Sequence, residues 1–207
     1  RGSNDLLHGI DGCGKSTQAA RLVRRLERSA AARPLHLREP GGSALGVRLR
    51  ALLLSREHDP SPAVETLLFA ASRRQMLDEV VAPALAQGRD VVCERSNAST
   101  FAYQAIAGGL PEDQVLELLR SWSDEPRPDR VVWLDLPAAL ASRRRGRPED
   151  RIEDHGEAFQ ERVAAGFRRW LERVPGCVRV DALGSEDEVE ARVVEALSDL
   201  QLEPSRG

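Results

Sequence analysis

Short apolar runs alternate along this chain with longer segments whose apolar residues recur at helical spacing. The short runs stop at glycine or at polar residues, which is typical of strands in a parallel sheet whose connections are helices. On this basis we expect five strands, at residues 6–9, 35–38, 90–93, 130–134 and 178–181.

Between the first two expected strands, Ala19, Leu22, Val23 and Leu26 are spaced at i, i+3, i+4 and i+7, which predicts an amphipathic helix. The same reasoning predicts further helices at residues 45–54, 64–85, 112–122, 138–144, 159–173 and 187–202. Five strands joined by helical crossovers fit one doubly wound sheet. We therefore expect a single three-layer α/β/α domain over residues 4–204.

One segment, residues 143–157, departs from this alternation. It is dense in charge, contains Gly146 and Pro148, and shows no apolar periodicity. This composition favours a short, arginine-rich, mobile lid.

Composition narrows the choice of partners. The 207 residues carry a formal net charge of −3, so there is no overall positive field to hold nucleic acid. No apolar stretch approaches the roughly 20 residues that cross a bilayer, and the first residues do not form a signal segment. We expect a cytoplasmic protein without nucleic-acid or membrane partners. Cys13, Cys93 and Cys177 are too widely spaced for a zinc motif or a disulfide framework, so reduced thiols are expected.

The clearest chemical motif lies between the first expected strand and helix. Residues 9–16 match the pattern G-x-x-x-x-G-K-[ST], which predicts a phosphate-binding loop. Such a loop turns backbone N–H groups toward an anion at the start of a helix. Its lysine reaches the β- and γ-phosphates of ATP, and its hydroxyl holds Mg²⁺. The residues expected at this ATP site are Gly9, Ile10, Asp11, Gly12, Cys13, Gly14, Lys15, Ser16 and Thr17.

Lys15 is also the only lysine among the 30 cationic residues, all the others being arginine. An ammonium on a flexible stem and a planar guanidinium are not interchangeable in a tight phosphate cradle. The loop itself indicates only a nucleotide, because many GTPases, ATPases and kinases share it.

The segments that follow the loop resemble thymidylate kinase. They are REPGG at 38–42, LG at 45–46 and LLL at 52–54, ETLLFAASR at 65–73, ER at 94–95 with Ser99 and AYQ at 102–104, PD at 128–129, VVWLDLP at 131–137, DRIE at 150–153 and VDA at 180–182. The resemblance covers nearly the whole chain. It implies a P-loop NTPase fold with a five-stranded parallel sheet, a homodimer, and phosphoryl transfer from ATP with Mg²⁺ to dTMP.

The resemblance assigns an acceptor site, including Glu39 and Pro40. Phe69 and Arg73 lie four apart on an expected helix, so they share a face, and the resemblance places Phe69 on thymine and Arg73 on base or phosphate. The alternative is a core phenylalanine beside a solvated arginine. Arg95 is implied to grip the acceptor phosphate.

Further along the chain, Glu94 is implied to act near Mg²⁺, although Glu94 and Arg95 could instead form a surface ion pair. Ser99, Tyr103 and Gln104 are implied to lie near sugar and base, with Tyr103 excluding a 2′-hydroxyl; ordinary helix packing is the other interpretation of Tyr103.

Two expectations concern charge at the reacting group. Asp11, inside an anion-binding loop, is implied to accept a hydrogen bond from the acceptor's 3′-hydroxyl, or else it shapes the loop as an Asx turn. One branch of the family carries an arginine in the loop, but here the residue after Asp11 is Gly12. The lid must then supply the charge. The lid arginines expected to contribute are Arg143, Arg147 and, above all, Arg151, with Arg144 and Arg145 nearby.

Three positions depart from the family's usual pattern: His8 replaces a glutamate, Glu94 an aspartate, and Ser96 an aromatic residue. The extra methylene of Glu94 moves its carboxylate by about 1 Å, a displacement that can cost about a hundredfold in rate. Two alternatives therefore stay open, a kinase for another nucleoside monophosphate and a catalytically weak ATP-binding homologue.

Overall fold

Five parallel strands form one sheet in the computed structural model, which describes residues 2–28, 32–145, 150–173 and 176–199. Their spatial order is β2-β3-β1-β4-β5, so the first strand occupies the centre. The strands are β1 (Asn4–His8), β2 (Leu35–Arg38), β3 (Val91–Glu94), β4 (Arg130–Asp135) and β5 (Cys177–Asp181). All five expected strands are confirmed, with boundaries that shift by one or two residues.

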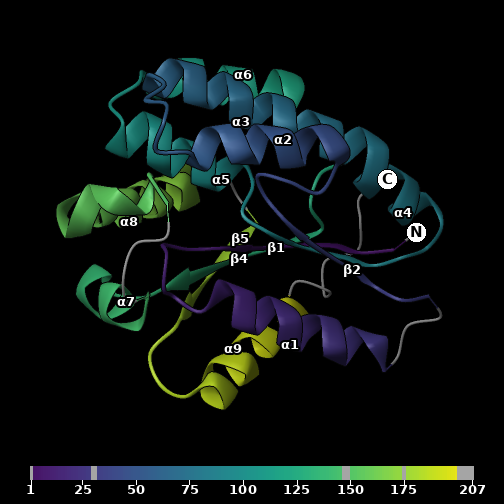
Figure 1. The fold of residues 1–207 in the computed structure, drawn as a ribbon. Coiled ribbons are helices and arrows are strands. Elements are labelled where there is room, and N and C mark those ends of the chain that lie inside the picture. The colour runs from purple at the N-terminus through teal and green to yellow at the C-terminus, as the bar shows by residue number, and fades with distance from the viewer. Residues whose placement is uncertain (1, 29–31, 146–149, 174–175, 200–207) are drawn as a thin grey trace.

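Helices cover both faces of this sheet (Figure 1). One face carries α1 (Lys15–Glu27) and α9 (Glu186–Asp199), and the other carries α2 (Ala44–Leu54), α3 (Pro62–Met76), α5 (Asn97–Thr100), α6 (Glu112–Trp122) and α8 (Gly156–Arg173). The remaining elements are α4 (Ala82–Ala86), α7 (Ala138–Arg145), the π-helical segments η1 (Leu77–Val81) and η2 (Phe101–Ala107), and the 3₁₀ turn η3 (Glu153–His155). The three-layer α/β/α architecture is confirmed.

Successive side chains of β1 pack into two different hydrophobic clusters, on opposite faces of the sheet. Leu6 packs in a cluster with Met76 and Leu77, whereas Leu7 belongs to the larger cluster that includes Ala19 and Leu22. Successive side chains of a strand point to opposite faces, so a five-residue strand that is buried throughout must be covered by helices on both sides.

The expected helix at 64–85 is a succession of three elements, α3, η1 and α4. The helical segment formed by α5 and η2 over residues 97–107 was not among the expected helices. Its first nine residues after Asn97 are almost all buried. A helix that is buried on every side has no polar stripe, so no 3.6-residue periodicity marks it in the sequence.

The lid boundaries also differ from the expectation. Residues 143–145 form the last turn of α7, and α8 begins at Gly156, so both ends of the expected lid are helical. Residues 146–149 lie outside the described residues, as do 200–202 at the end of the last expected helix. The three cysteines are free thiols, as predicted. Within the described ranges, no helix is both long and apolar enough to cross a membrane.

Candidate functional site

The phosphate-binding loop connects β1 to α1, as the motif predicted. Gly12 and Gly14 have φ angles of 85° and 96°, in the left-handed region that favours glycine, and Gly14 is the N-cap of α1. The first N–H groups of α1 have no partner within the helix, so their donors and the positive end of the helix dipole are available to an anion at this loop.

Lys15 lies inside this loop. Its buried Nζ donates a hydrogen bond to the carbonyl of Ile10 at 2.7 Å and lies 3.8 Å from a carboxylate oxygen of Asp11. Burial lowers the pKa of Lys15, and the positive charge of Arg95 adds to this, while Asp11 opposes it. The single lysine of the chain is therefore held where the triphosphate of a nucleotide is expected.

Gly12 lies directly against α7. A Cβ at this position would lie 2.1 Å from the carbonyl oxygen of Ala141 and 3.2 Å from the Cβ of Arg145. No side chain fits there without moving α7, so the loop has no room for an arginine. The space that a side chain at residue 12 would occupy is filled by the last turn of α7, at the base of the expected lid.

Arg95 follows β3 directly and has an unusual backbone. Its φ of 69° is the only positive value at a non-glycine residue among the described residues, and such conformations cluster at functional sites. Its guanidinium forms an ion pair with Asp11 and lies 5.3 Å from the centre of the Tyr103 ring. The Glu94 side chain is 4% exposed and that of Arg95 13%, and they pair with different partners, so the alternative of a surface ion pair between them is wrong.

Asp11 is held by partners outside the loop. One carboxylate oxygen pairs with Arg95, and the other accepts a hydrogen bond from the Tyr103 hydroxyl at 2.9 Å. Burial alone would raise the pKa of Asp11, but the charges of Arg95 and Lys15, with the hydrogen bond from Tyr103, hold it well below its usual range. The carboxylate is thus ionised and neutralised by its neighbours, which explains how it is tolerated inside an anion-binding loop.

Arg73 is fully enclosed, with an exposed fraction of 2%. Its Nε donates to Glu39 at 2.6 Å, and its two terminal nitrogens donate to Asn97 at 2.9 Å and Thr100 at 3.0 Å. The neighbouring Arg74 instead pairs with Asp78 on the surface. The alternative of a solvated Arg73 is therefore wrong.

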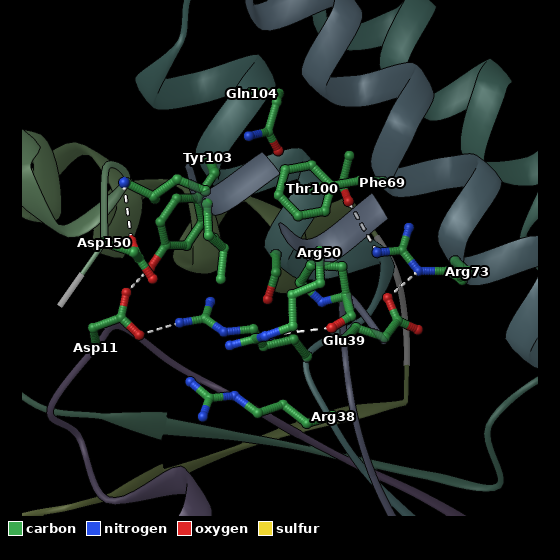
Figure 2. Close-up of a pocket in the computed structure, with 15 residues that line it drawn as sticks. Asp11, Arg38, Glu39, Arg50, Phe69, Arg73, Thr100, Tyr103, Gln104 and Asp150 are labelled. Atoms are coloured by element: carbon green, nitrogen blue, oxygen red, sulfur yellow. Dashed lines mark hydrogen bonds and ion pairs between the residues drawn. The ribbon is translucent and has the colours of Figure 1, made fainter. Parts of the chain in front are cut away.

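These groups surround one pocket of about 60 Å³ (Figure 2). In Figure 2, Asp11 and Tyr103 lie on one side of it and Arg73 with Glu39 on the other, while Phe69 presents its ring between them. The hydroxyl of Ser99 is buried without a hydrogen-bond partner among the described residues. The structure brings all nine expected acceptor residues to this pocket, namely Asp11, Glu39, Pro40, Phe69, Arg73, Arg95, Ser99, Tyr103 and Gln104.

Ser16 and Glu94 form the candidate metal site. The Ser16 hydroxyl donates to one Glu94 oxygen at 2.6 Å, and the Nε2 of His36 lies 2.8 Å from the other. Burial would raise the pKa of Glu94, but the hydrogen bonds from His36 and Ser16 and the charge of Arg38 lower it. Within the described ranges, no group of three or more His, Cys, Asp or Glu residues is arranged so that it could hold a metal ion. One hydroxyl and one carboxylate fit Mg²⁺, which keeps several waters and takes its other ligands from substrate phosphates.

The structure describes two of the three lid arginines expected to contribute, Arg151 and Arg143. Arg151 forms an ion pair with Glu65 on α3 and donates to the carbonyl of Leu53 at 3.1 Å. Arg143 is exposed, and in the described part of the chain no hydrogen bond or ion pair joins either arginine to the phosphate-binding loop. Arg147 lies outside the described residues. Because Asp150 and Ile152 line the pocket, this end of the lid covers the acceptor side.

Several residues of the site were not assigned a role from the sequence. Arg50 lines the pocket and donates to the carbonyl of Pro40 at 3.1 Å, and burial, followed by the charge of Arg38, lowers its pKa. Thr100 holds Arg73, and His36 contacts Glu94. For His36 a sequence signal was available. His36 and Arg38 are two residues apart on β2, so their side chains lie on the same face of the sheet, near the end of β3.

Comparisons with known proteins agree with this geometry. The family model described as thymidylate kinase matches residues 7–193. The thymidylate kinase of Synechococcus sp. (strain CC9311) is 47% identical over 169 residues, covering 78% of this chain and 80% of that protein. That of Chlorobaculum parvum is 37% identical over 208 aligned residues, covering 95% of each chain.

A solved structure, the thymidylate kinase from Ehrlichia chaffeensis, superposes with a TM-score of 0.78 at 26% identity, covering 96% of this chain and all of that one. Sequence and fold thus agree over almost the full length. The chain belongs to the thymidylate kinase family.

Proposed function

We propose that this chain transfers the γ-phosphoryl group of ATP to dTMP, giving dTDP and ADP. The observation that carries the proposal is that the pocket lined by Phe69, Arg73 and Arg95 adjoins the phosphate-binding loop, to which it is tied by the Arg95 to Asp11 ion pair. A switch that only binds a nucleotide would not need this second site. In this proposal, residues 4–204 form one catalytic domain.

Each group has a role that suits its placement. Lys15 and the loop amides hold the triphosphate, and Arg95 holds the acceptor phosphate in line with it, since positioning and charge stabilisation are most of what catalysed phosphoryl transfer requires. Phe69 stacks on thymine. Asp11 accepts a hydrogen bond from the acceptor's 3′-hydroxyl, taking the place of the one it now accepts from Tyr103. Mg²⁺, when bound, neutralises developing charge on the phosphates, and Ser16 and Glu94 are the residues that hold it.

We infer that the lid moves outward when dTMP enters, because Asp150 and Ile152 at its end line the acceptor pocket. The contacts of Arg151 with Glu65 and Leu53 join the lid to the two helices above the pocket. We infer that these contacts break during opening and that Arg151, once free of them, reaches the transferred group together with Arg143 or Arg147.

We also infer that the protein is a cytoplasmic homodimer. Large apolar side chains are exposed on three neighbouring helices, α2, α3 and α6, on the outer layer in Figure 1. They are Leu45, Val47, Leu52, Val64, Leu67 and Trp122, with Val47, Leu67 and Trp122 more than half exposed. Exposed apolar patches of this kind mark protein interfaces. Sedimentation analysis of the protein and of Leu67→Glu tests this, since only the variant should be monomeric.

A coupled assay of ADP release with a panel of nucleoside monophosphates tests the activity. ADP release that depends on dTMP, and that is lost in Lys15→Ala and in Arg95→Ala, supports the proposal. Activity with a different monophosphate would replace dTMP as the acceptor. ATP binding without release of ADP for any acceptor would refute phosphoryl transfer and leave a nucleotide-binding homologue.

A further inference from the structure

Glu94 is held by two hydrogen bonds, one to each carboxylate oxygen. Ser16 donates to Oε2 at 2.6 Å, and His36 Nε2 lies 2.8 Å from Oε1. The Glu94 side chain is only 4% exposed, whereas that of His36 is 34% exposed. The carboxylate therefore bridges a loop residue expected to bind the cation and a strand residue that does not belong to the loop.

The strand register puts His36 in reach. Strands β2 and β3 pair in parallel, with Arg38 opposite Glu94 and His36 opposite Val92. His36 thus lies two residues before Arg38, on the same face of β2. From this diagonal position the imidazole meets a glutamate carboxylate. An aspartate carboxylate would end about 1 Å short, which stretches the contact beyond hydrogen-bonding distance.

The length of Glu94 creates a need for this contact. A glutamate has one more rotatable bond than an aspartate, so fixing its carboxylate beside Ser16 costs more side-chain entropy. A second hydrogen bond from outside the loop restricts the carboxylate to one orientation. Groups that orient metal ligands in this way commonly change metal affinity or activity by 10- to 100-fold when they are removed.

We propose that His36 is a positioning residue, which holds the Glu94 carboxylate against the Ser16 hydroxyl so that both present oxygens to the cation of the bound nucleotide. The proposal rests on the function above only in assigning Ser16 and Glu94 to the cation. His36 and Glu94 form a matched pair in this chain, since the imidazole compensates for the longer acidic side chain.

The test is a double-mutant cycle of His36→Ala and Glu94→Asp, with His36→Gln as the conservative variant, because a glutamine amide can donate over a similar reach. The first readout is Mn²⁺ affinity, measured by electron paramagnetic resonance in the complex with a non-hydrolysable ATP analogue. The second is kcat and KM for dTMP at varied Mg²⁺. The exposed His58 provides the control variant, His58→Ala.

We expect His36→Ala to weaken Mn²⁺ binding and raise the Mg²⁺ half-saturation by about tenfold, with KM for dTMP unchanged. His36→Gln should restore most of this loss. In the Glu94→Asp background, His36→Ala should change Mn²⁺ affinity less than about twofold, because the shorter carboxylate does not reach the imidazole.

Two results would overturn the proposal: a His36→Ala protein whose melting temperature falls while its Mn²⁺ affinity does not, or an equal loss of affinity in both backgrounds. Either would leave His36 as a residue that merely joins two strands. Failure of the proposed function is distinguishable, because it would appear as absent dTMP-dependent turnover in the wild-type protein, whatever the Mn²⁺ measurements show.

Discussion

His8, at the end of β1, makes the stability of this protein sensitive to mild acid. The side chain is 1% exposed and packs beside Phe167, with 6.1 Å between the ring centres. Burial, followed by the positive charges of Arg73, Arg95 and Lys15, lowers its pKa from 6.5 to about 3. The imidazole is therefore neutral in the folded protein at any pH above that value.

The direction of the effect follows from proton binding. Above about pH 6.5 neither state binds the proton, so His8 contributes no pH dependence. Between that pH and about 3 the unfolded chain takes up a proton that the folded protein does not, so the free energy of unfolding falls as the pH falls. At about pH 5 the difference is about 1.5 pH units, or about 2 kcal/mol at about 1.4 kcal/mol per unit.

Urea unfolding at about pH 7.5 and about pH 5 measures this, at one fixed protein concentration and followed by fluorescence of the buried Trp133 and Trp170. His8→Gln should lose about 2 kcal/mol less than the wild type between the two pH values, whatever its stability at neutral pH. The exposed His58→Gln is the matched control and should behave as the wild type. Equal losses in all three proteins would refute a neutral His8.

Substitutions at three further residues test the roles of Lys15, Arg73 and Tyr103. Lys15→Arg should lower kcat at least about a hundredfold with little change in melting temperature, since a guanidinium does not fit the ammonium's place; a rate within tenfold of wild type would contradict this. Arg73→Leu leaves the buried Glu39 unpaired, so it should lower the free energy of unfolding, measured with denaturant, by about 3 to 5 kcal/mol. The adjacent Arg74→Leu removes an exposed pair and should lower it by less than about 1 kcal/mol. Similar losses for the two variants would argue against a buried ion pair. Tyr103→Phe should lower the free energy of unfolding by about 1 kcal/mol, because it removes the hydrogen bond to Asp11. Tyr103→Ala should raise kcat/KM for a ribonucleoside monophosphate relative to kcat/KM for dTMP, and an unchanged ratio would count against exclusion of the 2′-hydroxyl.

The sequence predicts the scaffold well because each strand and its connecting helix carry a local signal. The loop at residues 9–16 and the face shared by Phe69 and Arg73 are predicted from spacing alone, and in the structure Asp11 of the loop lines the same pocket as Phe69 and Arg73. The helix after β3 has no such signal, since it is buried on all sides.

Partners distant in sequence were likewise invisible to the sequence. The contacts of Arg73 with Glu39 and of Tyr103 with Asp11 join residues 34 and 92 positions apart. Only the fold determines which of many acidic residues an arginine meets. The same holds for the ion pair of Arg151 with Glu65, which joins residues 86 positions apart.

Gly12 limits how this enzyme could be redesigned. Because glycine has no Cβ, the carbonyl of Ala141 can approach this position closely. Substituting an arginine here would therefore displace α7, the helix that leads into the lid. The two ways of supplying positive charge to the migrating phosphoryl group are thus sterically exclusive in this chain. Replacing the lid arginines by a loop arginine requires the loop and α7 to change together, because the loop substitution alone would push α7 away from the loop.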